Sequence, residues 1–234
     1  MRFFVRKDEK LIVFVSFGGK RDDDSPRSIY NAMLKDSRFD DYKFVWAFLN
    51  PEQYEIPCGE KININSLRYI LTILRARVWV TNVSMLRGLK FKGRRTFYLN
   101  TWHGTPIKKC GLDTSQAAYL SKLSGYGTDV MLAQGSFEVE KFAHAFMLPI
   151  ERFAIIGYPR NDELVAADVV ARQKELRHKW QIPDGCKVLL YAPTFRDYVK
   201  DSNGGAVLLP PADIPSWPKR LNEKYVIFFT NNSI

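Results

Sequence analysis

Hydrophobic residues along this chain form two alternating patterns, unbroken apolar runs and apolar positions at helical spacing. The unbroken runs are short and rich in Val, Ile, Phe and Tyr, which is typical of strands buried on both faces. Between them, apolar residues recur as they do on one face of an amphipathic helix. The predicted strands are residues 11–17, 43–49, 78–82, 95–102, 129–135, 152–159, 187–195 and 225–230, and the predicted helices are residues 27–35, 66–76, 136–148 and 161–180.

Strands that alternate with helices in this way indicate an α/β domain built on a parallel sheet. Residues 1–160 contain enough predicted strands for one complete Rossmann-like domain. Residues 161–185 form a linker around a long amphipathic helix, which the Pro and Gly of "IPDG" end. Residues 186–234 hold only two predicted strands, too few for an independent sheet domain. We interpret them as the start of a second, incomplete domain.

The composition indicates a folded protein in a reducing compartment. Hydrophobic residues make up 46% of the 234 residues, ample for a packed core, and no apolar run is long enough to span a bilayer. The amino-terminal residues lack the features of a secretory signal. Cys58, Cys110 and Cys186 are far apart and have neither metal-ligand nor disulfide-framework spacing. This spacing suits the cytoplasm and predicts neither a disulfide framework nor a zinc site. We expect no metal and no cofactor.

The chain is strongly basic, with a formal net charge of +10 and a pI near 9.5. A positive surface favours an anionic partner: nucleic acid, a phosphorylated substrate or the anionic face of a membrane. The basic residues are dispersed along the sequence, and no helix-turn-helix, RRM or zinc motif is recognisable. We therefore expect no nucleic-acid partner.

Turn residues combined with charge follow four of the predicted strands. Ligands of open parallel sheets bind beyond the carboxyl ends of the strands, so we expect these loops to line one shared cleft. Their sequences are "SFGGKRDDDS" (16–25), "WHGTPIKK" (102–109), "GYPRND" (157–162) and "YAPTFRD" (191–197).

His103 is the strongest candidate for a general base, because imidazole titrates near neutral pH and can accept a proton from a hydroxyl. Gly104 allows a sharp turn and a close approach of substrate to the backbone. Pro106 suits the first turn of a following helix, whose N-terminal N–H groups would attract phosphate. Lys108 and Lys109 add positive charge. The alternative is a strand-end histidine bonded to a neighbouring carbonyl and followed by solvated lysines.

The other strand-end motifs supply further candidate phosphate ligands. The "GGK" at 18–20 lacks the spacing of a Walker loop, but it places Lys20 at a strand end. Arg160 stands beside a candidate helix N-cap, Asn161 or Asp162. It is suited either to bind phosphate bidentately or to pair with Asp162 or Glu163. The last motif offers Thr194, Arg196 and Asp197.

Taken in order, "NTWHGTPIKKCG", "GYPRND" and "YAPTFRD" resemble the motifs of the CDP-glycerol glycerophosphotransferase family. This family contains the teichoic acid primases and polymerases of bacterial cell-wall synthesis. The stretch "FVSFGGKRDDDSPRSIYNAMLKDSRFDDYKFVW" also resembles the amino-terminal part of the family's transferase domain. The likeness extends from about residue 11 to residue 197.

The resemblance implies a GT-B-like fold, in which paired Rossmann-like halves face a cleft. It implies transfer of glycerol phosphate, or of ribitol phosphate in relatives, from a CDP-activated donor such as CDP-glycerol. The implied acceptor is a hydroxyl of a lipid-linked glycan or of a growing teichoic acid chain. The enzyme would work in the cytoplasm, peripherally attached to the anionic inner face of the cell membrane.

The resemblance also implies residue roles. His103 would deprotonate the acceptor hydroxyl, while Lys108 or Lys109, Arg160 and Arg196 would face phosphate. The full set of candidate substrate-binding or phosphate-binding residues is Lys20, Gly104, Thr105, Lys108, Lys109, Arg160, Asp162, Thr194, Arg196 and Asp197.

The sequence departs from the family pattern in its last part. A second histidine in a His-Pro context and a later Asp-Tyr-Ser-Ser-like segment help to form the donor site in the family, and neither occurs in this chain. We therefore expect little or no transfer by this chain alone. Two other functions stay open: a sugar-nucleotide glycosyltransferase of GT-B type, and a non-catalytic module that binds the acceptor or the membrane.

Overall fold

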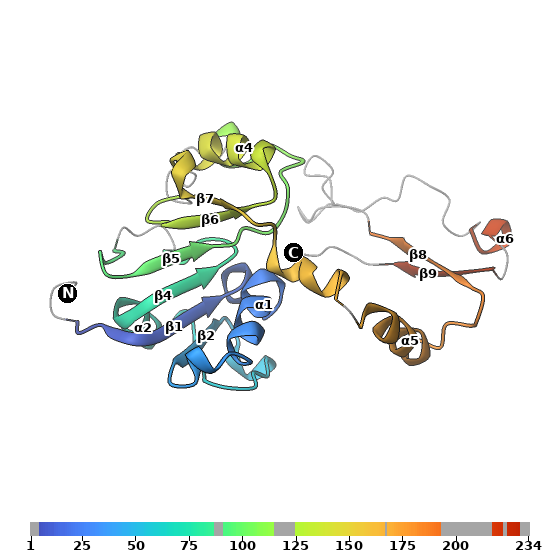
Figure 1. Cartoon of the computed structure of the whole chain (residues 1–234), viewed down its shortest axis with the longest axis horizontal. Coiled ribbons are helices and arrows are strands. Elements are labelled where there is room, and N and C mark those ends of the chain that lie inside the picture. Colours follow the sequence, from blue (N-terminus) through green and yellow to red (C-terminus); the bar gives the residue numbers. More distant parts are fainter. Residues whose placement is uncertain are drawn as a thin grey trace, which may run out of the picture. The chain divides into compact units, whose positions relative to one another are not determined.

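The computed structural model of the chain describes residues 5–86, 91–114, 125–166, 168–192, 217–221 and 224–229. The chain divides into two compact units, Met1–Val165 and Ala166–Ile234. The first unit is built on a seven-stranded sheet, and the second contains a two-stranded sheet (Figure 1).

Every strand of the first sheet runs parallel to its neighbours, in the order β3-β2-β1-β4-β5-β6-β7 (Figure 1). The α/β fold with a parallel sheet that the alternating pattern predicts is therefore confirmed. The chain begins in the middle of the sheet and winds first to one edge and then to the other, so its direction reverses between β1 and β4. The strands are β1 (Asp8–Val15), β2 (Lys43–Phe48), β3 (Glu60–Asn63), β4 (Ala76–Thr81), β5 (Phe97–Asn100), β6 (Val130–Ala133) and β7 (Phe153–Ile155).

Side chains of β1 alternate between two core clusters, one on each face of the sheet. Val13 packs with Tyr69 of the helix α2 on one face. Phe14 packs with Tyr30 of the helix α1 on the other face, where the two rings meet edge to face at 5.5 Å. Both faces of β1 are thus covered, as its unbroken apolar run requires. The α-helices of this unit within the described residues are α1 (Asp24–Met33), α2 (Leu67–Arg75) and α4 (Ser136–Phe146).

A third core cluster joins α4 to β6. Phe142 and Phe146 of α4 pack with Met131 of β6, and the ring of Trp102 packs against them. The loop that follows β5 is therefore anchored to α4 by its tryptophan. The short 3-10 helices of the unit are η1 (Phe17–Gly19), η2 (Ser37–Phe39), η3 (Pro51–Gln53), η4 (Gly111–Asp113), η5 (Ile150–Arg152) and η6 (Pro159–Leu164).

The second unit contains α5 (Val169–Lys179), β8 (Lys187–Tyr191), α6 (Trp217–Leu221) and β9 (Tyr225–Phe229). The two strands pair in parallel along their whole lengths. Aromatic contacts support the pair: Trp180 meets Phe228 edge to face, and Tyr191 meets Trp217 in the same way. Of the strands predicted at 187–195 and 225–230, the structure shows residues 187–191 and 225–229.

Two predictions about elements are wrong or incomplete. Instead of one helix over residues 161–180, the structure has η6 and the separate helix α5, because the backbone at Val165 (φ −119°, ψ 9°) leaves the helical region. The edge strand β3 is not among the predicted strands. Ile62 is its only fully buried residue, so its sequence carries little apolar signal.

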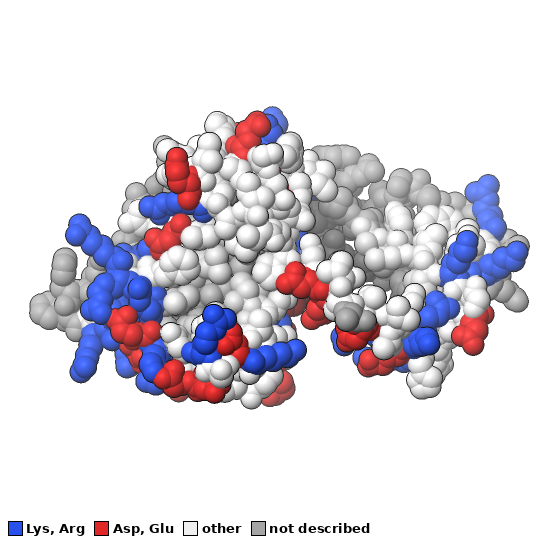
Figure 2. Space-filling model, in the orientation of Figure 1, with Lys and Arg blue, Asp and Glu red and all other residues white. Residues whose placement is uncertain are grey.

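Basic and acidic side chains intermingle on the face of the first unit that Figure 2 shows. Lys43 of β2 pairs with Asp8 of β1 at 2.9 Å, and Arg68 of α2 pairs with Glu60 of β3 at 2.6 Å. Exposed pairs of this kind contribute little to stability. In the part of the chain that the structure describes, no helix is long and apolar enough to cross a membrane.

Candidate active site

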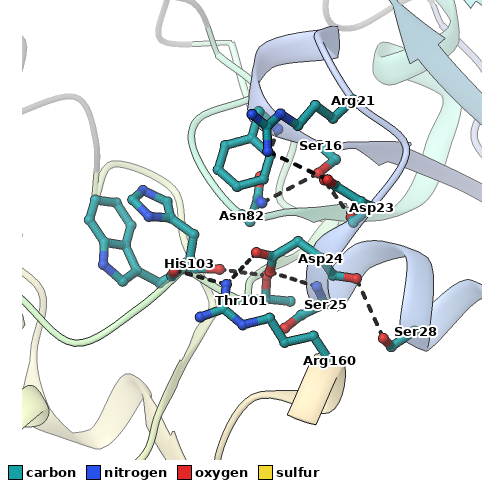
Figure 3. Close-up of polar contacts among 12 residues, drawn as sticks. Ser16, Arg21, Asp23, Asp24, Ser25, Ser28, Asn82, Thr101, His103 and Arg160 are labelled. Carbon is teal, nitrogen blue, oxygen red and sulfur yellow. Dashed lines mark hydrogen bonds and ion pairs between the residues drawn. The ribbon is translucent and has the colours of Figure 1, made fainter. Parts of the chain in front are cut away.

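The candidate site lies where β1, β4 and β5 end, beside the point at which the direction of winding reverses. Crevices at such points are the usual ligand sites of open α/β sheets. Phe17, in the loop after β1, donates its backbone N–H to Asn82 Oδ1 after β4, at 2.8 Å. Thr101, after β5, donates its N–H to the Thr81 carbonyl at 2.7 Å. Three strand ends are thereby joined into one surface (Figure 3).

His103 occupies this surface between two aromatic rings. Its imidazole stacks on Trp102, with ring centroids 4.2 Å apart, and lies 5.7 Å from the ring of Phe17. Burial lowers the pKa of His103 below its ordinary value of 6.5; the charge of Asp24 opposes this shift, and that of Arg160 adds to it. The imidazole is therefore neutral at pH 7 and able to accept a proton.

Arg160 of η6 reaches the main chain of His103. Its Nη1 donates a hydrogen bond to the His103 carbonyl at 2.9 Å and also pairs with Asp24 Oδ2 (Figure 3). The sequence alternative in which Arg160 pairs with Asp162 or Glu163 is thus not what the structure shows. Asp162 is exposed. The Asp24 side chain is only 6% exposed, so the ion pair with Arg160 is largely shielded from water.

Gly104 and Thr105 have different structural roles. Gly104 has a φ of +149°, which favours glycine, and a Cβ there would lie 3.6 Å from Arg160 Nη2. Thr105 donates its hydroxyl hydrogen to Glu138 Oε1 and accepts a hydrogen bond from Gln134 Nε2 at 2.9 Å. The Thr105 hydroxyl is therefore engaged in holding its own loop.

Glu138 is a buried carboxylate that the sequence analysis does not single out. It is 2% exposed, and it also accepts hydrogen bonds from the Gln134 N–H at 2.7 Å and the Tyr158 hydroxyl at 2.8 Å. Burial alone would raise the pKa of Glu138, but the bonds from Thr105, Gln134 and Tyr158 hold it below the ordinary 4.5. Burial and the adjacent carboxylate raise the pKa of Tyr158. Glu138 stands at helical spacing from Phe142, and that spacing puts it on the buried face of α4. This was the signal in the sequence that could have identified Glu138.

None of the described contacts joins Lys20, Lys109 or Asp162 to His103. The expected helix at Pro106 is absent: residues 103–110 form a loop with neither helix nor strand, and the next helical segment is η4. Lys108 and Lys109 are exposed. Lys20 is also exposed, and its carbonyl accepts a hydrogen bond from the Tyr54 hydroxyl. Thr194, Arg196 and Asp197 lie outside the described residues. Within the described residues, no group of three His, Cys, Asp or Glu side chains is arranged to hold a metal ion.

The sheet order and the strand-end site define an open parallel α/β protein with a candidate ligand site at the reversal of winding. The chain belongs to the family described as CDP-Glycerol:Poly(glycerophosphate) glycerophosphotransferase, whose sequence pattern matches residues 1–231. The family expected from the strand-end motifs is confirmed, and with it the expectation of a transferase family in teichoic acid synthesis.

Named relatives agree with this assignment. The chain is 35% identical over 230 residues to the teichoic acid poly(glycerol phosphate) polymerase of Staphylococcus epidermidis, covering 93% of this chain and 32% of that protein. It is 30% identical over 236 residues to the teichoic acid glycerol-phosphate transferase of Staphylococcus aureus, covering 94% of this chain and 59% of that protein. The chain thus spans a third to three-fifths of the length of these relatives.

Solved structures support the GT-B-like fold. The wall teichoic acid polymerase TagF superposes with a TM-score of 0.84 at 33% identity, over 95% of this chain and 56% of that one. A TagF variant studied with CDPG superposes with a TM-score of 0.85. UDP-GlcNAc 2-epimerase from Neisseria meningitidis, at 13% identity and a TM-score of 0.55, shares the fold alone.

Proposed function

We propose that the chain takes part in the transfer of glycerol phosphate from CDP-glycerol to a hydroxyl group in teichoic acid synthesis, with His103 as general base. The observation that carries the proposal is the half-buried imidazole of His103 at the winding reversal, stacked on Trp102 and with its main chain bonded to the guanidinium of Arg160. Family membership supports the donor, since the family is described by CDP-glycerol, and one TagF variant was studied with CDPG.

The chemistry requires one bond to form and one to break. His103 accepts the proton of the acceptor hydroxyl, whose oxygen forms a bond to the phosphorus that carries glycerol. The bond from that phosphorus to the CMP oxygen breaks, and CMP leaves with the bonding electron pair. Transfer of this kind needs in-line positioning, a base and positive charge near the phosphate oxygens. Arg160, which donates a hydrogen bond to the His103 carbonyl, supplies positive charge beside the His103 loop.

We infer further that the acceptor is lipid-linked and that the protein lies peripherally on the inner face of the cell membrane. The support is a loop in which Ile107 is 96% exposed and is followed directly by exposed Lys108 and Lys109. An exposed apolar side chain beside lysines suits contact with an anionic bilayer surface. The net charge of +10 favours the same partner.

The donor is tested by a transfer assay with radiolabelled CDP-glycerol and a lipid-linked acceptor. Two proteins are compared, the chain alone and the chain fused to the second half of a polymerase relative. Each reaction is challenged with unlabelled CDP-glycerol, CDP-ribitol or a UDP-sugar. The proposal is supported if labelled glycerol phosphate is incorporated and if only the unlabelled CDP-polyols suppress that incorporation. Transfer of sugar from the UDP-sugar without incorporation of glycerol phosphate would indicate a glycosyltransferase, and binding of acceptor vesicles without any transfer would indicate a binding module.

A further inference from the structure

Strained backbone is concentrated around His103. In the described part of the chain, five non-glycine residues have a left-handed φ. Two of them, Met147 and Gln181, lie within two residues of a helix carboxyl end, where such a conformation is common. The other three are Phe17 (φ 44°), Asp24 (φ 64°) and Trp102 (φ 51°). Strain of this kind persists where the surrounding structure over-determines it, and it gathers at functional sites.

The rings of Phe17 and Trp102 flank the His103 imidazole directly. Asp24 is linked to His103 through Arg160. Its carboxylate lies at the amino end of α1, where the helix dipole favours negative charge. Oδ1 accepts the N–H of Ser25 at 2.6 Å, and Oδ2 pairs with Arg160 (Figure 3). Both carboxylate oxygens of Asp24 are therefore occupied, and the side chain is 6% exposed.

Arg160 links Asp24 to the main chain of His103. The same nitrogen that pairs with Asp24 donates a hydrogen bond to the His103 carbonyl at 2.9 Å. Asp24 and Arg160 are 136 residues apart, on α1 and η6, and His103 follows β5. One partly buried ion pair thus fixes the main chain of the base relative to two other strand ends.

We propose that Asp24 is a positioning residue for the transfer reaction, which holds the Arg160 guanidinium against the His103 carbonyl and so sets the place of the imidazole. The proposal rests on the proposed function and deepens it. Asp24 is not itself a base or a substrate ligand, because its carboxylate is buried and satisfied by Ser25 and Arg160. The charged groups that act on His103 from the elements packed around it are Asp24 and Arg160.

The test compares Asp24→Asn with Asp23→Asn. Asparagine tolerates a left-handed backbone and retains an oxygen for Ser25, so Asp24→Asn removes the charge without adding strain. Asp23→Asn removes the same charge one residue earlier, from an exposed carboxylate that lies 3.7 Å from Arg21. Should Asp24→Asn fail to fold, Asp24→Gly, which accepts the same φ, replaces it.

The first readout is an NMR titration of His103 in the 234-residue chain, assigned by the signal that disappears in His103→Gln. Asp24→Asn should move the His103 midpoint to lower pH, and Arg160→Gln should move it to higher pH, since the two charges act in opposite directions. Asp23→Asn should leave it in place. General loosening of the fold would not give shifts of opposite sign. An unchanged midpoint in both Asp24→Asn and Arg160→Gln would overturn the proposal.

The second readout is the kinetics of transfer. Asp24→Asn should lower kcat by about 10-fold to 100-fold, the effect of a small misplacement of a catalytic group, with a smaller change in KM. Asp23→Asn should stay within about twofold of the wild type. Wild-type kcat in a folded Asp24→Asn variant would contradict the positioning role. If the wild type transfers nothing, the proposed function fails for this chain, while the His103 titration still decides the role of Asp24.

Discussion

The Thr105 hydroxyl donates a hydrogen bond to Glu138, a carboxylate that lies 33 residues further along the chain and is 2% exposed. This contact ties the loop that carries His103 to the first turn of α4. The same carboxylate accepts the Tyr158 hydroxyl from the segment that leads to Arg160. The buried carboxylate of Glu138 therefore joins the loop that carries His103 to the segment that carries Arg160.

Replacing this carboxylate should destabilise the first unit. Glu138→Ala leaves the Thr105 and Tyr158 hydroxyls and the Gln134 N–H without their acceptor. Hydrogen bonds to a charged group contribute more than neutral ones, and buried groups left unpaired are costly, so the free energy of unfolding should fall by about 2–3 kcal/mol. Urea denaturation followed by circular dichroism measures this change.

The matched control is Glu140→Ala, on the same helix. Glu140 is exposed and pairs only with its neighbour Lys141 among the described contacts. Its removal should change the free energy of unfolding by less than about 0.5 kcal/mol. Equal effects of Glu138→Ala and Glu140→Ala would show that the buried carboxylate has no special structural role.

The acid limb of the pH profile should lie below the ordinary histidine range. Burial lowers the pKa of His103 from 6.5, so the base stays deprotonated until the pH falls below that value. The midpoint of the acid limb of kcat/KM should therefore fall below pH 6.5. A midpoint at or above 6.5 would mean that His103 is solvated or that another group limits the reaction.

The same shift has a consequence for stability. The unfolded chain takes up the histidine proton at a higher pH than the folded chain does. Stability should therefore decrease as the pH falls from about 6.5 through the lowered pKa. His103→Gln should remove this part of the pH dependence, which chemical denaturation at a series of pH values can measure.

Gly111 should be less tolerant of substitution than Gly18, although both have a left-handed φ. A Cβ at Gly111 (φ +57°) would lie 2.2 Å from the Ala145 carbonyl oxygen of α4, whereas nothing lies within 4 Å of a Cβ at Gly18 (φ +65°). Gly18→Ala should cost about 1–2 kcal/mol for the backbone alone. Gly111→Ala should cost about 3–5 kcal/mol, because η4 must also move away from α4. Similar thermal shifts for the two variants would contradict this close approach.

The sequence predicts the parts of the fold that depend on local patterns. The buried strand at residues 11–17 has an unbroken apolar run because helices cover both of its faces. His103 and Arg160 could be selected because both follow strands, and parallel strands bring their carboxyl ends to one edge of the sheet.

The partners of these residues could not be predicted in the same way. Asp24 meets Arg160 across 136 residues, and the run of three aspartates at 22–24 gives no reason to prefer the third. A left-handed backbone at Asp24 has no sequence signal either, since most residues with that φ are glycines. The break near Val165 was missed because residues 161–180 retain a helical pattern on both sides of it.

The measurement that tests the central claim most directly is the transfer of labelled glycerol phosphate from CDP-glycerol by the fused polypeptide, with and without His103→Ala. General-base catalysis contributes about 10²-fold to 10⁴-fold, so His103→Ala should lower kcat by that factor while circular dichroism shows an unchanged fold. An equal rate in the two proteins would contradict the assignment of His103 as the base.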